Sequence, residues 1–403
     1  MKDDLKTEVV NPKIDEEKNK SSNSNNSNKR VGDIFRKLLQ NKIMKYMVML
    51  VGFLVIFLLV MFIVSVLFPG KPSYAKVEAT MENAARAYFH DRSDKLPQEE
   101  LSSVSISAER LAELKYMKTL DKYFKDDTEC SGNVTVTKNS ADTYNYVGYL
   151  DCGKDYVTKE FYKEIIASKN IVNNGYGIYN INNEFVYKGE IKNNYVMVDK
   201  LLFRIVKVNS NNEVVLILNE PTTVREVWDD RFNKSQDWES GINDYAVSRA
   251  RDYLKNMYNV GDDETIKLSA STKEKLVKFN ACIGKRKEDE TAKDNSVECS
   301  RMLSNQIISL LTAADYMNAS ADVNCRKTLD KSCKNYNYLA DDENWWLLTA
   351  DAKNDYDVYQ VDNGIIDVFK ASQTAKFKPI IHLGPTTKYD SGKGTEKDPY
   401  KFR

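Results

Sequence analysis

Histidine is scarce in this sequence, which contains only His90 and His382 among 403 residues. Ser-His and Cys-His catalysis both need an imidazole beside the nucleophile, so the shortage argues against those enzyme classes. His382 lies in the apolar segment 379–383, where a strand residue with a satisfied side chain is a simpler interpretation than a catalytic base. We therefore expect a protein that is not an enzyme of these classes.

Two further features are missing. The six cysteines include no C-x-x-C pair, which is the spacing typical of zinc sites. The chain also has no excess of positive charge, because 59 Lys and Arg residues balance 59 Asp and Glu residues. Nucleic-acid-binding domains usually carry a strong basic bias, so we expect no nucleic acid partner.

Charged residues are absent from Met47 to Phe68, a run of 22 residues. About 20 apolar residues suffice for a helix to cross a bilayer. A buried core helix would keep some polar face, and a cleaved signal peptide would have a shorter apolar stretch and an A-x-A-like site. Here 46 residues precede the run and Pro69-Gly70-Lys71-Pro72 follows it. We expect a single transmembrane helix over residues 46–68, uncleaved and in contact with the lipid bilayer.

The flanking charges predict the orientation of this helix, because cations collect on the cytoplasmic side. Six cations lie in the 20 residues before the run, and two follow it closely: Lys29, Arg30, Arg36, Lys37, Lys42 and Lys45, then Lys71 and Lys76. All the cysteines lie after the run, which agrees because disulfides persist outside the cytosol. We expect a single-pass cell-membrane protein with a cytoplasmic N-terminus and an extracellular C-terminal domain.

Residues 1–45 are expected to be a disordered, basic cytoplasmic tail. They contain 11 basic and 7 acidic residues, a net charge of +4, and a Ser/Asn-rich segment that cannot form a core. Such a tail suits an anionic inner leaflet. A docking role for a cytoplasmic partner is the alternative.

Residues 74–165 are expected to form a small α+β module. Val77, Met81, Ala84 and Tyr88 have helical spacing, and Ser107 is a candidate N-cap for a second helix. Two alternating segments around residues 134–137 and 144–150 predict a hairpin with its turn near residue 141. That register places Cys130 opposite Cys152, so we expect a disulfide between them.

Residues 175–403 are expected to form a second, mixed α/β domain. Three strands in a meander are predicted at 194–198, 202–208 and 214–218, and helices near 245–258 and 306–317. Asn363-Gly364 predicts a two-residue turn between strands 358–361 and 365–369, and 379–383 is the last strand. We expect a disulfide between Cys282 and Cys299 to close the polar segment 285–296 as a solvent-exposed loop. A second disulfide, between Cys325 and Cys333, should close a tighter loop. The fold class is therefore α+β, stapled by disulfides.

Three motifs stand out in this second domain: the strand pair 194–206, the segment 311–349 with Trp345-Trp346-Leu347, and the ending 377–400 with Gly392-Lys393-Gly394-Thr395 and Pro399-Tyr400. Taken in this order, they resemble a family of unknown function on surface proteins of Firmicutes. The resemblance covers about residues 176–402 and implies a fold similar to C-type lectins. Lys378 stands where that family usually has Arg, and Thr349-Ala350 where it has Ser-Pro.

Candidate binding residues come mainly from tryptophan. Trp345 and Trp346 are adjacent, so on a strand they would point to opposite faces, one into the core and one to a ligand platform or a covering loop. Trp228 and Trp238 lie close to Asp229, Asp230 and Glu239, which makes sugar stacking or a carboxylate-dependent hydrolase conceivable. Packing tryptophans and turn acids are the plainer interpretation.

Calcium is the one cofactor that the acidic clusters suggest, around Asp341-Asp342-Glu343 or around Asp351, Asp355 and Asp357. Neither cluster matches the EF-hand loop, and solvated acids are the simpler interpretation. No cofactor is otherwise expected.

These observations predict a membrane-anchored bacterial surface protein that binds a glycan or another envelope component in adhesion. Two alternatives stay open. The chain could be a structural or regulatory envelope component that binds a membrane-protein partner, or a carboxylate-dependent hydrolase.

Overall fold

The computed structural model describes residues 42–67, 71–99, 102–124, 128–140, 143–261 and 266–403. It divides into two compact units, each considered by itself. One unit contains helix α2, Lys42–Leu67, and the other contains both of the modules predicted after the apolar run. The part of the predicted tail before residue 42 lies outside the described residues.

Helix α2 has 26 residues and includes most of the uncharged run. Its described side chains, at 46–47 and 49–62, are exposed, including Phe53 at 72% and Ile56 at 62%. Counting only the side chains that the structure describes, no helix of the chain is long and apolar enough to cross a membrane.

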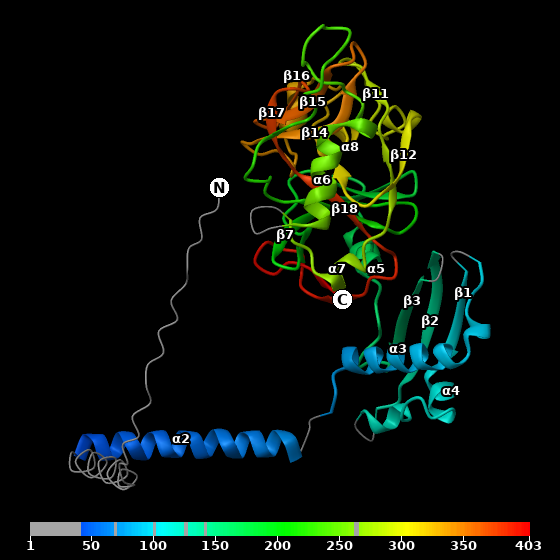
Figure 1. The fold of residues 1–403 in the computed structure, drawn as a ribbon, viewed down its shortest axis with the longest axis vertical. Helices are drawn as coiled ribbons and strands as arrows, with labels where there is room; N and C mark the ends of the chain where they lie inside the picture. Colours follow the sequence, from blue (N-terminus) through cyan, green and yellow to red (C-terminus); the bar gives the residue numbers. More distant parts are fainter. Residues whose placement is uncertain (1–41, 68–70, 100–101, 125–127, 141–142, 262–265) are drawn as a thin grey trace, which may run out of the picture. The chain divides into compact units, whose positions relative to one another are not determined.

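The module of residues 74–165 contains one long helix, two short helices and a three-stranded antiparallel sheet in the order β1-β2-β3 (Figure 1). Its elements are α3 (Tyr74–Asp91), β1 (Ser103–Ser107), α4 (Ala108–Glu113), β2 (Ser131–Ser140), β3 (Thr143–Asp151) and α5 (Phe161–Ile165). The predicted helices and hairpin are confirmed, and the Ser107 hydroxyl accepts from the backbone N–H of Arg110 as an N-cap. Strand β1 was not predicted.

Helix α3 packs tightly on the sheet. It buries an apolar stripe of Val77, Met81, Ala84, Ala85 and Phe89. A side chain at Gly148 on β3 would put its Cβ 3.0 Å from the Glu78 carbonyl oxygen. Because glycine leaves this space free, the Gly148 N–H can donate to Glu82 Oε1 at 2.8 Å.

All three predicted disulfides are confirmed: Cys130–Cys152, Cys282–Cys299 and Cys325–Cys333. In the hairpin, Ser131 pairs with Asp151, which is the register that sets Cys130 opposite Cys152. Hydrophobic alternation and turn position were therefore enough to predict this cross-link.

The larger module contains a seven-stranded antiparallel sheet in the order β13-β18-β8-β7-β5-β4, with β6 also pairing with β7. Its strands are β4 (Gly177–Ile181), β5 (Glu184–Lys188), β6 (Tyr195–Val198), β7 (Leu201–Val208), β8 (Val214–Leu218), β13 (Ser309–Leu310) and β18 (Pro379–Leu383). The predicted meander is confirmed as β6, β7 and β8, and the strand predicted at 379–383 as β18. It is not the last strand, because two short strands follow it at Tyr389–Ser391 and Lys401–Phe402. The hairpin of β4 and β5 was not predicted.

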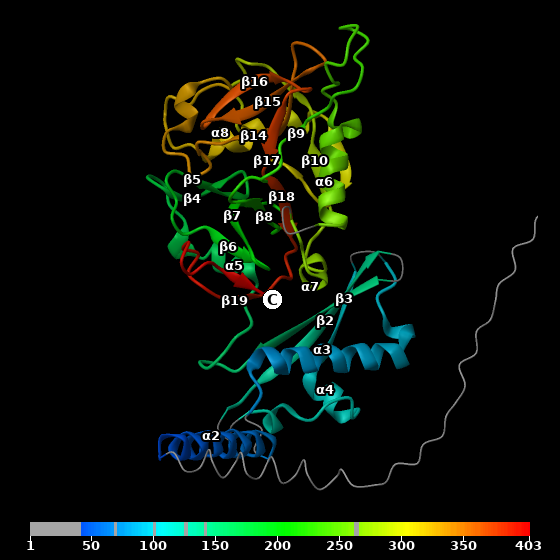
Figure 2. The same ribbon diagram turned by 60° about the vertical axis from the view of Figure 1, so that its left-hand side comes forward.

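A second, mixed sheet has the order β16-β15-β14-β17-β9, and β11 pairs with β14. Its strands are β9 (Glu226–Val227), β11 (Lys285–Arg286), β14 (Asn344–Asp351), β15 (Asp357–Asp362), β16 (Ile365–Lys370) and β17 (Thr374–Phe377). The predicted turn between β15 and β16 is present, with positive φ at Asn363 (48°) and Gly364 (76°). Figure 2 shows this sheet above the seven-stranded one.

The remaining elements are short. They are α6 (Arg249–Asn259), α7 (Ala270–Lys273), β10 (Phe279–Cys282), β12 (Met302–Gln306), α8 (Ala313–Ala319), β19 (Tyr389–Ser391) and β20 (Lys401–Phe402). Within the described ranges, 3₁₀ turns lie at Ser93–Lys95, Leu120–Lys122, Ser168–Asn170, Tyr245–Val247, Glu298–Ser300 and Lys331–Lys334. Helix α8 contacts β5 of one sheet and β14 of the other. The described chain is thus a mixed α/β structure of the α+β class with three disulfides.

Two predictions for this module need correction. The helix predicted over 306–317 begins only at Ala313, because the Thr312 side chain caps it and the preceding residues pair as strands β12 and β13. The segment 285–296 is not simply a solvent loop. Arg286 is fully buried and pairs with buried Glu298 at 3.1 Å, which fixes the segment from within.

Candidate functional site

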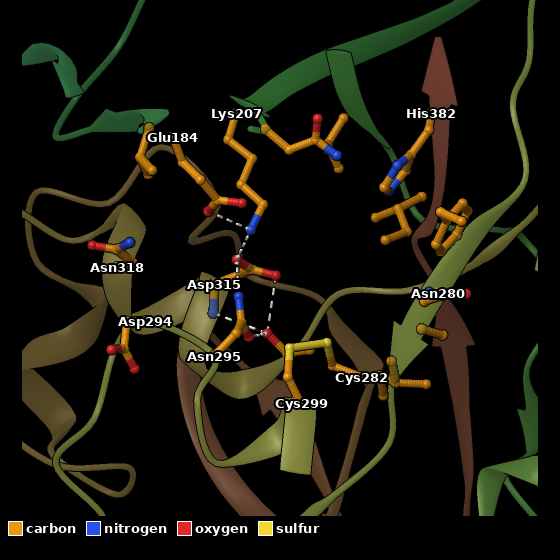
Figure 3. A pocket seen from close by; sticks show the side chains of 18 of the residues that line it. Glu184, Lys207, Asn280, Cys282, Asp294, Asn295, Cys299, Asp315, Asn318 and His382 are labelled. Carbon is orange, nitrogen blue, oxygen red and sulfur yellow. Dashed lines mark hydrogen bonds and ion pairs between the residues drawn. A yellow bond between two sulfur atoms is a disulfide. The ribbon is translucent and has the colours of Figure 1, made fainter. Parts of the chain in front are cut away.

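A cavity of about 340 Å³ opens in the larger module (Figure 3). Its walls come from β5, β7, β8, β10, β13, β18, the start of α8 and the loop before Asn295. Ligand pockets in proteins begin at roughly this size, about 300 Å³. The cavity is the candidate site because it brings together buried charged and polar side chains from distant parts of the sequence.

Lys207 is the central cation of the cavity. Strand β7 has a register shift against β8 between Ile205 and Lys207, and such bulges re-aim the following side chain. The Lys207 ammonium lies 3.0 Å from Glu184 Oε2 and 3.2 Å from Asp315 Oδ1. Burial opposes the charged form, yet attraction to Asp315 and Glu184 outweighs it and raises the pKa of Lys207. The lysine is therefore protonated and held between two carboxylates.

Asp315 is fixed by its place in the first turn of α8. Its backbone N–H donates to the hydroxyl of the N-cap Thr312 at 3.0 Å, and its Oδ2 lies 2.9 Å from the same hydroxyl. The Asn295 amide donates to Asp315 Oδ1 at 2.7 Å. Asn295 itself has a positive φ of 61° and is 8% exposed. Helix capping and the loop thus hold one carboxylate in a single position.

His382 and Glu213 form a second polar pair. His382 Nδ1 lies 2.9 Å from Glu213 Oε2, which also accepts from the Asn209 amide at 2.8 Å. The His382 ring stacks on Phe279 with centroids 3.8 Å apart. Burial lowers the pKa of His382, although the hydrogen bond with Glu213 opposes the shift. Burial would raise the pKa of Glu213, but the bonds from His382 and Asn209 outweigh it and lower the pKa.

The disulfide between Cys282 and Cys299 forms part of the cavity wall. The segment that it closes contributes Lys293, Asp294 and Asn295 to the same wall. The cross-link and the loop therefore belong to the site.

The predicted tryptophan residues lie mostly elsewhere. Trp228, Trp345 and Trp346 are each 0% exposed, and their indole N–H groups donate to Leu347 O, Asp341 Oδ1 and Glu226 O respectively. They cannot form a surface platform for a ligand. Trp238 is 45% exposed and has the Lys370 ammonium 4.9 Å from its ring centroid. None of the four lines the cavity.

Asp229 and Asp230, two of the acids predicted beside the tryptophans, have structural partners. Asp229 is fully buried and accepts from Arg231 and from the backbone N–H of Ile242. Asp230 pairs with Arg249 at 2.7 Å. The turn acids therefore hold the loop before α6.

The two acidic clusters considered for calcium are also occupied by protein groups. Asp341 pairs with Lys378, and Asp355 accepts from the Ser235 hydroxyl at 2.7 Å. Within the described part of the chain, no group of three or more His, Cys, Asp or Glu residues could hold a metal ion.

The sequence reasoning missed Lys207, Glu184 and Asp315, and it gave His382 only a structural role. One signal was present. Strand β7, from Leu201 to Val208, is apolar apart from two cations, Arg204 and Lys207, and a cation in such a strand needs a buried partner. The sequence around Lys207 could not predict which residues pair with it, because Asp315 follows more than 100 residues later.

Comparison with known proteins identifies no relative. No family model, no curated protein and no solved structure matches this chain. The resemblance to a surface-protein family of Firmicutes stays a prediction.

Proposed function

We propose that this chain is a membrane-anchored surface protein whose cavity binds a sugar unit of a glycan. The observation that carries the proposal is the composition of the cavity wall. Five amides line it together with the Lys207 cluster and His382: Asn182, Asn209, Asn280, Asn295 and Asn318. These groups suit the hydroxyl groups of a sugar, because an amide both donates and accepts hydrogen bonds and an ionised carboxylate accepts them, each in a defined direction.

The volume of the cavity supports a small ligand. About 340 Å³ accommodates one sugar ring or a compact pair, and pockets of this kind use a few fixed polar groups to orient the ligand. Those groups are prearranged here, since Lys207, Asp315 and Asn295 hold one another through hydrogen bonds. A prearranged site loses less side-chain entropy when it binds.

Binding fits this geometry better than glycoside hydrolysis. A hydrolase needs two carboxyls on either side of the scissile bond, one of them a proton donor. In the cavity, Glu184 and Asp315 both contact the Lys207 ammonium, which lies between them. The third carboxyl of the cavity wall, Asp294, accepts from the Ser296 hydroxyl at 2.6 Å. The hydrolase alternative therefore has no pair of carboxyls free for this chemistry in the cavity.

Membrane attachment is the second part of the proposal. Helix α2 extends over 26 residues and contains no charge after Lys45. Its described side chains are exposed and apolar, which is expected where lipid is the solvent. The basic residues before it favour a cytoplasmic N-terminus, and three disulfides favour an extracellular location for the rest. The lectin-like fold implied by the family resemblance belongs to the same proposal.

A glycan array tests the proposal. The full chain in detergent micelles, with its disulfides intact, is applied to immobilised bacterial and host glycans, and positive signals are competed with the free sugar. We expect saturable binding that the free sugar abolishes. Trp238→Ala should leave the signal unchanged, because Trp238 does not line the cavity. A folded chain that binds no glycan would overturn the proposal.

A further inference from the structure

His382 is one of only two histidines in the chain, and it lies in the cavity wall. Strand β18 holds it through pairing with Val215 on β8, and the residue is 8% exposed. Phe279 covers one face of the imidazole. These contacts hold the ring in the cavity wall.

The bond with Glu213 determines which ring nitrogen carries the proton. A carboxylate can only accept, so at 2.9 Å the imidazole must donate Nδ1–H to it. Glu213 is held for this role by the β7–β8 turn, where its backbone N–H donates to Asn209 Oδ1 at 2.9 Å. A neutral imidazole with hydrogen on Nδ1 presents Nε2 as a bare acceptor. No hydrogen bond joins His382 Nε2 to any other described residue.

We propose that His382 determines ligand specificity by accepting, at Nε2, a hydrogen bond from a hydroxyl group of the bound sugar, and that protonation of His382 switches binding off. This inference rests on the proposed function of the cavity. A site built around an acceptor rejects analogues that lack the matching donor, because Nε2 would then be buried unpaired. A sugar that is O-methylated or deoxygenated at the contacted position should therefore bind poorly.

The charged groups around His382 support an acid-sensitive switch. Glu213 faces it from the turn before β8, Lys207 from β7 and Asp315 from α8. Glu213 favours the imidazolium and Lys207 opposes it, while burial under Phe279 and in the cavity lowers the pKa below its ordinary value. Binding should thus stay constant around neutral pH and weaken as the pH falls through the lowered pKa of His382, by about tenfold per pH unit once His382 is largely protonated.

The test uses the full chain labelled with ¹⁵N-histidine, whose imidazole spectrum contains only two residues. The probes are methyl glucoside, methyl galactoside, methyl mannoside, N-acetylglucosamine and their singly O-methylated forms. His90→Gln assigns the exposed His90 and serves as the control, since its side chain is 89% exposed. At neutral pH we expect His382 to show a protonated Nδ1 and a bare Nε2, and the Nε2 signal to shift when a probe binds.

His382→Asn is the matched variant. Its side-chain amide can still donate to Glu213, but it offers nothing at the position of Nε2. We expect roughly tenfold weaker binding, loss of the acid dependence, and loss of discrimination against the O-methylated probe. Glu213→Gln should keep the fold and give a mixture of the two imidazole tautomers.

The outcomes separate the two proposals. If a probe binds but the Nε2 signal does not move, or His382→Asn binds as the unaltered chain does, the role of His382 is wrong and the sugar site stands. If Nε2 carries the proton in the free chain, the inference is likewise overturned. If no probe binds a folded chain, the sugar site fails, and the inference that rests on it fails too.

Discussion

Glu78 is a buried carboxylate on α3 that joins the first module to the end of the chain. It is 0% exposed and accepts hydrogen bonds from Tyr156, Thr158, Lys388 and Arg403. Burial alone would raise the pKa of Glu78, but the bonds from Arg403 and the charge of Lys388 outweigh it and lower the pKa to about 2. The folded state therefore strongly prefers the ionised form.

This preference predicts how stability depends on pH. An unfolded glutamate has a pKa near 4.5, so Glu78 contributes stability that is fully present above pH 4.5 and is lost as pH falls towards 2. The difference between the folded and unfolded pKa values of Glu78 corresponds to about 3 kcal/mol in the free energy of unfolding. Glu78→Gln should lower the free energy of unfolding by about that amount at pH 7 and by much less near pH 2. Denaturant unfolding of the full chain at several pH values measures it.

Glu113→Gln on α4 is the matched control, because its ion pair with Arg110 is solvent-exposed and exposed pairs contribute little. Glu113→Gln should change the free energy of unfolding by less than about 1 kcal/mol at every pH. If both variants behaved alike, the network around Glu78 would not stabilise the fold as described.

At the scale of elements, the sequence predicted the strands and turns that depend on local residue patterns. The hairpin of β2 and β3, the meander of β6 to β8 and the turn at Asn363-Gly364 follow from alternation and turn chemistry. Strands β11 and β17 were missed because they pair in parallel with β14, which comes from a distant part of the sequence. Such pairings leave no periodic signal in short strands of two to four residues.

The disulfide between Cys282 and Cys299 leads to a prediction at this scale. It closes a segment of 17 residues whose end carries Asn295, the partner of Asp315. Replacing both cysteines by serine should cost about 3 kcal/mol of stability and also weaken sugar binding, because the cavity wall loses its anchor. Denaturant unfolding and calorimetric titration of the full chain measure the two effects.

Serine at Cys325 and Cys333 provides the comparison. That bridge spans only 8 residues, so its removal should lower the free energy of unfolding slightly less than removal of Cys282–Cys299 does. Because it does not line the cavity, its removal should leave the affinity for the sugar unchanged. Equal loss of affinity in the two double variants would argue against a specific role for the loop of Asn295.

At the scale of the whole molecule, the candidate site could not be predicted from sequence. Lys207, Asp315 and His382 come from β7, α8 and β18, and only the folded sheets bring them together. The tryptophan pattern was misleading for a physical reason. Strand β14 lies between β15 and β17 and is buried on both faces, so alternation placed neither Trp345 nor Trp346 at the surface. Fold class and disulfides, in contrast, followed from composition and spacing.

Membrane attachment predicts where the chain is found in cells. The intact chain should sediment with membranes, and protease added to intact cells should remove the part after Lys71. An epitope placed before residue 42 should stay protected until the cells are lysed. The six cysteines should react with maleimide only after reduction. A chain that stays in the soluble fraction, or whose C-terminal part resists external protease, would contradict the proposed topology.

The central claim, that the cavity holds the sugar, is tested most directly by blocking it. Asn280 lines the cavity from β10 and is exposed, so Asn280→Trp should fill the space without disturbing Lys207 or Asp315. Lys278→Trp, two residues earlier and outside the cavity wall, is the control. Calorimetric titration with the sugar found on the array should show no binding to Asn280→Trp and unchanged affinity for Lys278→Trp. Unchanged affinity in a folded Asn280→Trp chain would contradict the account.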